Sequence, residues 1–213
     1  MSLGVSEIRG GSGMLVKICG ITRLEDAEVA VDCGAQAIGF VFWPESPRYI
    51  APSRARAIVQ RLPPFVTSVG VFVNQPVVHV NETAALVGLG VVQLHGDEDR
   101  GHATSIGRPV LKAMTVAGAM AMADDEWPAP SMILLDAHDP VRRGGTGRTI
   151  DWTGAASVSS RRRIVLAGGL TVDNVARAIA CVRPFGIDVS SGVEQAPGIK
   201  DHGRIRALFE AIP

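Results

Sequence analysis

The sequence has no excess of charge of either sign, because 21 lysine and arginine residues balance 21 aspartate and glutamate residues. Proteins that bind nucleic acid usually carry a basic surface, so the composition argues against a nucleic-acid partner. The chain also has no apolar run that approaches the roughly 20 residues of a membrane span, so we expect no membrane partner. An anionic ligand must therefore be bound by local donors.

The sequence is also poor in cysteine. Its three cysteines, Cys19, Cys33 and Cys181, are irregularly spaced and form no C-x-x-C motif. This pattern is typical of reduced thiols in a cytoplasmic protein, and it excludes a disulfide framework or a zinc site of the usual spacing. No cluster of His, Asp and Glu has metal-ligand spacing, and no dinucleotide-binding fingerprint is present. We therefore expect neither a metal nor another cofactor.

Eight short apolar runs recur along the chain, with helical or loop segments between them. Their starts are roughly 20 to 30 residues apart, which is enough for a strand, a helix and two loops. The runs are predominantly apolar instead of alternating, as in parallel strands that are covered on both faces. The predicted strands are residues 15–19, 37–42, 67–73, 91–94, 110–113, 132–136, 164–167 and 186–189.

The clearest helix signals lie after the first and seventh runs. Thr22 is a candidate N-cap with Glu25 completing a capping box, and Gly34 can end that helix. Thr171 is the expected N-cap of a helix over residues 172–181.

Eight strand–helix units in about 200 residues favour an α/β fold of the (β/α)8 TIM-barrel type. The alternative is a doubly wound open sheet, which seldom contains eight such regular units. We expect a single domain over residues 14–213, preceded by a flexible N-terminal extension over residues 1–13. Two long loops after strands, residues 43–52 and 137–152, would lie on the catalytic face as candidate lids.

Two strand ends carry groups suited to proton transfer. Cys19 ends the first strand, and we expect its thiol to face the positive end of the next helix, which lowers a thiol pKa and makes it usable as a base or nucleophile. The alternative is an inert buried cysteine. Asp136 ends the sixth strand at the rim of an apolar barrel, where partial desolvation favours the neutral acid that can donate a proton.

Glycine-rich loops after the last two strands predict a phosphate site. Gly168 and Gly169 lead into a helix, and Ser190, Ser191 and Gly192 follow the last strand. Glycines let backbone amides approach an anion, and TIM barrels usually bind phosphate in these two loops. In a separate loop, Gly145 belongs to the stretch 144–147 (GGTG), which could fold over the same phosphate or be only a flexible loop.

Nine segments along the chain carry a family resemblance. They are KICGIT (17–22), GFVFWPESPRYI (39–50), VGVFVN (69–74), VQLHGDE (92–98), LLD (134–136), GGTG (144–147), LAGGL (166–170), DVSSGVE (188–194) and PGIKD (197–201). Together they resemble phosphoribosylanthranilate isomerase, an enzyme family of tryptophan biosynthesis. They cover residues 15 to 201 in the family's order, and the combination is far more specific than any single motif.

The resemblance implies a ribulose-phosphate-binding barrel that catalyses an Amadori rearrangement of a phosphorylated small molecule. By this resemblance, Asp136 is the general acid that protonates the ribose ring oxygen, and Cys19 is the general base that removes the C2 proton. Arg48 takes the position expected to bind the anthranilate carboxylate, which also suits a planar guanidinium. Gln93 and His95 are expected to line the substrate pocket. A monomer or weak homodimer is expected.

Two residues depart from the family's pattern. Ile150 stands where an aromatic residue is usual, and Trp43 stands where a smaller aromatic is expected. Neither is a proposed catalytic residue.

Two alternatives are another ribulose-phosphate-binding barrel enzyme, such as indole-3-glycerol-phosphate synthase, and, from a different class, a binding protein without catalysis. An indole-3-glycerol-phosphate synthase would need a lysine acid and a glutamate pair at strand ends. Lys17 and Lys112 lie on predicted strands, but no glutamate ends one. A phosphate-metabolite binding protein without catalysis would need neither Cys19 nor Asp136, so the presence of both favours an enzyme.

Overall fold

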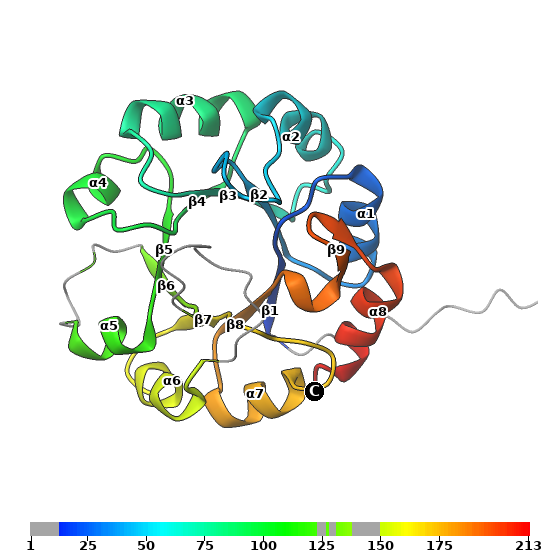
Figure 1. The fold of residues 1–213 in the computed structure, drawn as a ribbon, viewed down its shortest axis with the longest axis vertical. Helices are drawn as coiled ribbons and strands as arrows, with labels where there is room; N and C mark the ends of the chain where they lie inside the picture. Colours follow the sequence, from blue (N-terminus) through cyan, green and yellow to red (C-terminus); the bar gives the residue numbers. More distant parts are fainter. Residues whose placement is uncertain (1–12, 123–126, 128–130, 138–149) are drawn as a thin grey trace, which may run out of the picture.

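Eight parallel strands form a closed barrel, as Figure 1 shows in a view along the barrel. The computed structural model describes residues 13–122, 127, 131–137 and 150–213. The barrel closes where the first strand pairs with the eighth, which excludes the doubly wound open sheet. The strands are β1 (Leu15–Ile18), β2 (Ala37–Val41), β3 (Thr67–Phe72), β4 (Val91–Leu94), β5 (Val110–Met114), β6 (Met132–Leu135), β7 (Ile164–Leu166) and β8 (Gly186–Val189).

Helices surround the barrel, and each of the first seven follows the strand of the same number (Figure 1). None of the helices in the described ranges is long and apolar enough to cross a membrane. They are α1 (Leu24–Asp32), α2 (Pro52–Val59), α3 (Val77–Val87), α4 (Arg100–Thr104), α5 (Val116–Ala121), α6 (Trp152–Ser159), α7 (Val175–Val182) and α8 (His202–Ala211).

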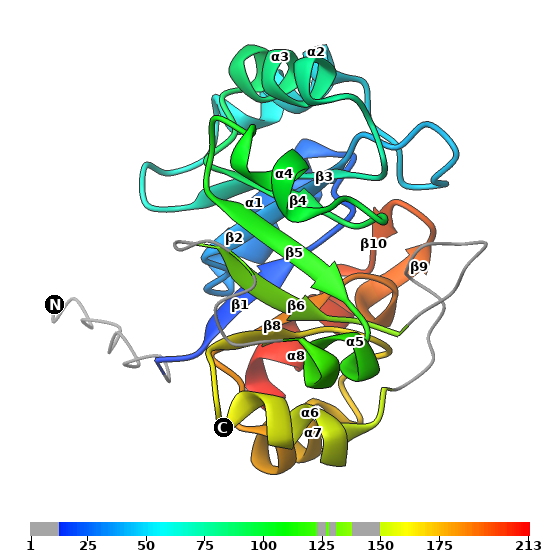
Figure 2. The ribbon, with the colours of Figure 1, turned by 90° about the vertical axis from the view of Figure 1, so that its left-hand side faces the viewer.

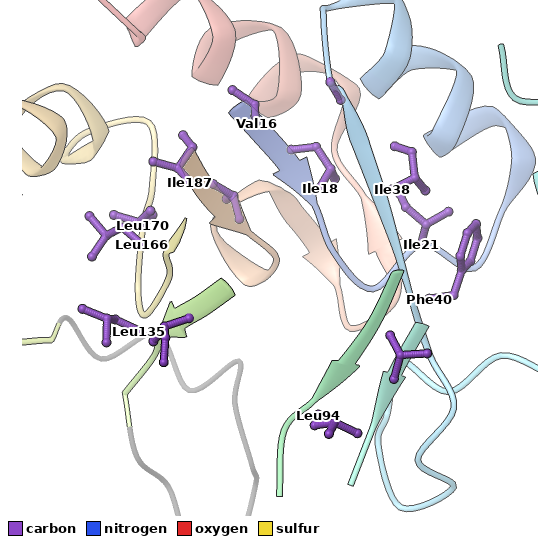
Figure 3. Close-up of a cluster of buried hydrophobic side chains, with 14 of the residues drawn as sticks. Val16, Ile18, Ile21, Ile38, Phe40, Leu94, Leu135, Leu166, Leu170 and Ile187 are labelled. Carbon is purple, nitrogen blue, oxygen red and sulfur yellow. The ribbon is translucent and has the colours of Figure 1, made fainter. Parts of the chain in front are cut away.

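The strand pattern divides side chains between two layers. On β1, Val16 and Ile18 pack into the large apolar cluster between strands and helices, part of which Figure 3 shows. Because side chains alternate along a strand, Lys17 and Cys19 point the other way, into the barrel. There Cys19 packs with Val41, and the partly buried Trp43 packs against this cluster.

Two short strands that the sequence did not predict, β9 (Glu194–Ala196) and β10 (Ile199–Lys200), form an antiparallel pair after β8. A one-turn 3-10 helix, η1 (Ser191–Val193), leads into them. Figure 2 shows the pair beyond the end of the barrel to which the strand arrows point. Their residues therefore lie beside the mouth of the barrel, where active sites of this fold are found.

Two predicted helix starts are wrong. The helix α1 begins at Leu24 with no side-chain cap, because the Thr22 hydroxyl instead donates a hydrogen bond to the carbonyl of Gly198. The helix α7 begins at Val175 and not at residue 172, and the Thr171 amide donates to Oδ1 of Asn174. In both cases the residue that the local sequence suggested as a cap makes another contact instead, a tertiary contact for Thr22 and a turn contact for Thr171. The end of α1 is as predicted, with Gly34 at φ +110° just after it.

Candidate active site

Cys19 lies at the mouth of the barrel immediately after β1 and is buried, with 7% of its surface exposed. Room for its side chain depends on Gly39 of β2. A Cβ at position 39 would lie 2.9 Å from Sγ of Cys19 and 3.1 Å from Cε of Lys17. A larger residue at position 39 would therefore displace both side chains.

The charged groups around Cys19 are not those that the sequence suggested. Burial raises the pKa of the Cys19 thiol, and the carboxylate of Asp188 raises it further, whereas the ammonium groups of Lys17 and Lys200 lower it. The net effect is a pKa above the ordinary value. The expected net lowering of this pKa was wrong, because desolvation outweighs the two ammonium groups.

Asp136 is connected to both residues that the sequence placed in the pocket from β4. Its Oδ2 lies 3.2 Å from Nε2 of His95, and Nδ1 of His95 lies 2.8 Å from Nε2 of Gln93. With the Gln93 amide donating to Nδ1, the ring hydrogen resides on Nε2 and faces Asp136. The other carboxyl oxygen of Asp136, Oδ1, accepts a hydrogen bond from the amide of Ala137 at 2.7 Å.

Residues of the predicted phosphate loops share a cavity with Asp136. Its lining comprises Asp136, Ala167, Gly168, Gly169, Leu170, Asp188, Ser190 and Ser191. Gly168 and Gly169 have φ values of +80° and +67°, a backbone conformation that favours glycine. Gly192 lies beside this lining, and a Cβ there would collide with the carbonyl of Leu170. The two loops are thus packed closely, whereas Gly145 lies outside the described residues.

Arg48 reaches the mouth from the loop after β2, but its guanidinium is already engaged. Its Nη2 lies 2.7 Å from Oε2 of Glu194, and its Nε donates to Oε1 at 2.9 Å. Lys200 Nζ contacts the same carboxylate at 2.8 Å. Two cations thus share one carboxylate, so the group as a whole stays positive and can still attract an anion.

Sequence reasoning did not identify four buried charged residues as ion-pair partners. They form the pairs Lys112–Glu98 and Lys200–Glu194, each with an Nζ–O distance of 2.8 Å. Glu98 lies in the loop after β4, and Glu194 begins β9, a strand that the sequence did not predict, so the sequence pattern paired neither with a lysine. For Lys112, a lysine in an otherwise apolar run was the available signal, since such a charge requires a partner when buried. Within the described ranges, no three His, Cys, Asp or Glu side chains are placed to bind a metal ion.

Comparison with known proteins identifies similar chains over almost the whole length. The family model described as "N-(5'phosphoribosyl)anthranilate (PRA) isomerase" matches residues 16–211. A protein from Pelobacter propionicus named N-(5'-phosphoribosyl)anthranilate isomerase is 51% identical over 91% of this chain and 93% of its own. One of the same name from Citrifermentans bemidjiense is 52% identical over 91% and 94%.

Solved structures give the same result. The phosphoribosyl anthranilate isomerase of Thermotoga maritima is 45% identical, with a TM-score of 0.84 over 93% of this chain and 98% of its own. That of Thermus thermophilus is 42% identical, with a TM-score of 0.83 over the same shares. A third, 43% identical with a TM-score of 0.81 over 93% and 97%, is a complex with reduced 1-(o-carboxyphenylamino)-1-deoxyribulose 5-phosphate.

Proposed function

The chain belongs to the N-(5'-phosphoribosyl)anthranilate isomerase family, and we propose that it acts in tryptophan biosynthesis by isomerising N-(5'-phosphoribosyl)anthranilate. The product is 1-(2-carboxyphenylamino)-1-deoxyribulose 5-phosphate, and the reaction is a general acid–base Amadori rearrangement. The observation that carries the assignment is the cavity in which Asp136 meets both phosphate-loop segments. A phosphate held there leaves the sugar beside a proton donor.

The proton transfers are divided between two residues. Asp136 gives a proton to the ribose ring oxygen, and cleavage of the bond between that oxygen and C1 leaves a carbon–nitrogen double bond at C1. Cys19 as thiolate then takes the C2 proton, which gives an enolamine, and tautomerisation to the ketone completes the isomerisation. Because the reaction only moves hydrogen within the substrate, it needs no external oxidant.

The contacts of Asp136 hold its carboxyl group in one orientation, as a positioned acid requires. Its carboxyl group has His95 on one oxygen and the Ala137 amide on the other, so its orientation is defined. Nε2 of His95, 3.2 Å from Oδ2, holds the carboxyl group from one side. In this proposal Gln93 and His95 line the substrate pocket and also hold the acid.

The remaining assignments concern binding. Gly168, Gly169, Ser190, Ser191 and Gly192 would bind the phosphate, with Gly145 as a further candidate. Arg48 would bind the substrate carboxylate while Glu194 holds its Nε and Nη2 side. The ion pair leaves Nη1 as a donor for the incoming carboxylate, so Glu194 orients Arg48. The site is not neutralised, because Lys200 supplies a second positive charge.

The fluorescence of N-(5'-phosphoribosyl)anthranilate disappears on conversion and provides the test. We expect purified protein to consume this substrate and expect the Cys19→Ala and Asp136→Asn variants to lose most of the rate. Indole-3-glycerol formation instead of isomerisation, or no turnover by folded protein, would contradict the proposed function. Turnover that survives both substitutions would contradict the residue assignments alone.

We further propose a cytoplasmic protein that is a monomer or weak homodimer. Among the solved relatives, the phosphoribosylanthranilate isomerase of Thermotoga maritima is dimeric, and one structure shows monomers generated from it. In this chain Phe65, 95% exposed, is one of only five exposed large hydrophobic residues in the described ranges. Obligate dimers bury large apolar surfaces. Sedimentation over a range of concentrations tests this expectation, and a stable dimer at nanomolar concentration would contradict it.

A further inference from the structure

A buried ion pair inside the barrel has no role in the proton transfers described above. Lys17 on β1 is 1% exposed, and its Nζ lies 2.9 Å from Oδ1 of Asp188 on β8. The two residues are direct neighbours in the register that closes the barrel, although 171 positions separate them in the chain. Both side chains are therefore fixed at the seam between the first and last strands.

This pair lies directly next to the proposed base. Lys17 and Cys19 are two residues apart, so their side chains leave the strand on the same inner face. Both side chains also approach Gly39, with Sγ of Cys19 and Cε of Lys17 within about 3 Å of the position that a Cβ would occupy there. The absence of a side chain at position 39 thus lets the lysine and the thiol share one space.

Stability alone does not account for a lysine at this place. Desolvating an ion pair costs several kcal/mol per ion, and replacing such a pair by apolar residues of similar volume is often neutral or stabilising. Burial lowers the pKa of the Lys17 ammonium, but Asp188 and Cys19 outweigh this effect and raise it above its ordinary value. Lys17 therefore stays protonated, and its positive charge is held against the thiol throughout the neutral range.

We propose that Lys17, anchored by Asp188, is a positioning residue whose ammonium stabilises the thiolate of Cys19. Only the identity of the proton that Cys19 accepts rests on the proposed function. Lys17 keeps its own proton: the thiolate takes the C2 proton and becomes a thiol, and the electron pair of the broken C–H bond enters the enolamine. The charge that Lys17 faces is thus present before proton transfer and absent after it.

Three charged groups act on the thiol, and they do not act alike. Lys17 on β1 and Lys200 on β10 favour the thiolate, whereas Asp188 on β8 opposes it. The charge of Lys200 is offset by Glu194 at 2.8 Å. Removing Lys17 should therefore raise the midpoint of the thiol titration, and removing Asp188 should lower it, although both changes break the same ion pair.

Direct titration of the thiol tests this prediction without any substrate. In a Cys33→Ala/Cys181→Ala background Cys19 is the sole thiol, so ultraviolet thiolate absorbance against pH gives its midpoint, with Cys19→Ser as the blank. We expect Lys17→Met to raise the midpoint by about one pH unit and Asp188→Asn to lower it by about one unit. Neutral-pH kcat should fall about tenfold in Lys17→Met, with little change in KM.

Lys112→Met is the matched control. Lys112 is also buried on a strand and pairs with a carboxylate at 2.8 Å, but it shares the outer layer with Val110, whereas Cys19 faces the barrel interior. We expect it to leave the Cys19 midpoint unchanged.

Two results would overturn the proposal: shifts of the same sign in both single variants, or no shift in either. If a single variant fails to fold, the Lys17→Met/Asp188→Asn protein decides, because it buries no unpaired charge. Its midpoint should rise, since the influence of Lys17 exceeds that of Asp188, and an unchanged or lower midpoint would overturn the proposal. Because isomerisation is measured separately, loss of the proposed function would not be confused with either result.

Discussion

The two sides of the proposed active site are built differently. On the Cys19 side, β1 and β8 surround the thiol with buried charges, and Lys17 and Asp188 are fixed by strand register. On the Asp136 side, the carboxyl group is held at the rim by hydrogen-bonding partners from β4 and the following loop. The base is thus placed among fixed charges of both signs, whereas the acid is held in place by neighbouring nitrogen atoms of His95 and Ala137.

The two sides also depend on different supports. The loop after β4, which carries His95, is held by Glu98, whose oxygens accept the amides of Asn74 and Gly96. Lys112 donates to Glu98 at 2.8 Å and to the carbonyl of Gly96 at 2.7 Å. The Asp136 side therefore relies on a loop held from outside the barrel, and substitutions there should act through geometry more than through charge.

The largest expected effect is the loss of either proton-transfer group. We expect Cys19→Ala and Asp136→Asn each to lower kcat by on the order of 10² or more with modest change in KM, because a positioned acid or base acts in the transition state. Steady-state kinetics on folded variants measures this. A tenfold or smaller loss in one variant would show that its side of the site is dispensable.

Next in size is the support of the Asp136 side. Glu98→Gln keeps the shape of the side chain but leaves Lys112 buried without its counter-ion, and we expect the free energy of unfolding to fall by about 2 kcal/mol. Urea unfolding at neutral pH measures the change. An equal unfolding free energy in Glu98→Gln and parent protein would contradict the supporting role of this pair.

The same pair gives the pH dependence of stability. Burial raises the pKa of Glu98, but Lys112 and the amide of Asn74 outweigh burial and hold the pKa below its ordinary value. A carboxylate with a lowered pKa adds stability above its unfolded-state pKa of about 4.3 and loses it as pH falls through the folded-state pKa. The stability difference between parent and Glu98→Gln should therefore shrink below about pH 4.

Arg48 tests the binding contribution of the Cys19 side. We expect Arg48→Ala to raise KM about tenfold with a smaller effect on kcat, because a carboxylate contact is kept from ground state to transition state. Arg54, an exposed arginine on α2, provides the control. Unchanged KM in Arg48→Ala, or an equal rise in Arg54→Ala, would remove the proposed role of Arg48.

The smallest expected effect concerns His95. His95→Gln keeps a hydrogen-bond donor near Asp136 but removes a group that can exchange a proton, so we expect kcat to fall by only about threefold to tenfold. The pH profile of kcat in the parent and the variant provides the measurement. A loss as large as that of Asp136→Asn would make His95 itself the acid.

Local sequence predicted the strands well and the helix caps poorly. Val91–Leu94 and Gly186–Val189 have the predicted bounds because short, largely apolar runs without alternation fit strands covered on both faces. Thr22 was mispredicted as a cap because its hydroxyl binds Gly198, a residue 176 positions away. A contact of that separation leaves no signal in the sequence around Thr22.

The sequence by itself determined the barrel, the family and the residue types at the strand ends, because periodicity and motif order are properties of the chain alone. Only the tertiary structure decided which charged groups lie next to one another. It placed Asp188 against Lys17 across the closing seam and Glu194 against Arg48. Electrostatic energies depend on distance and burial, and closing the barrel sets both.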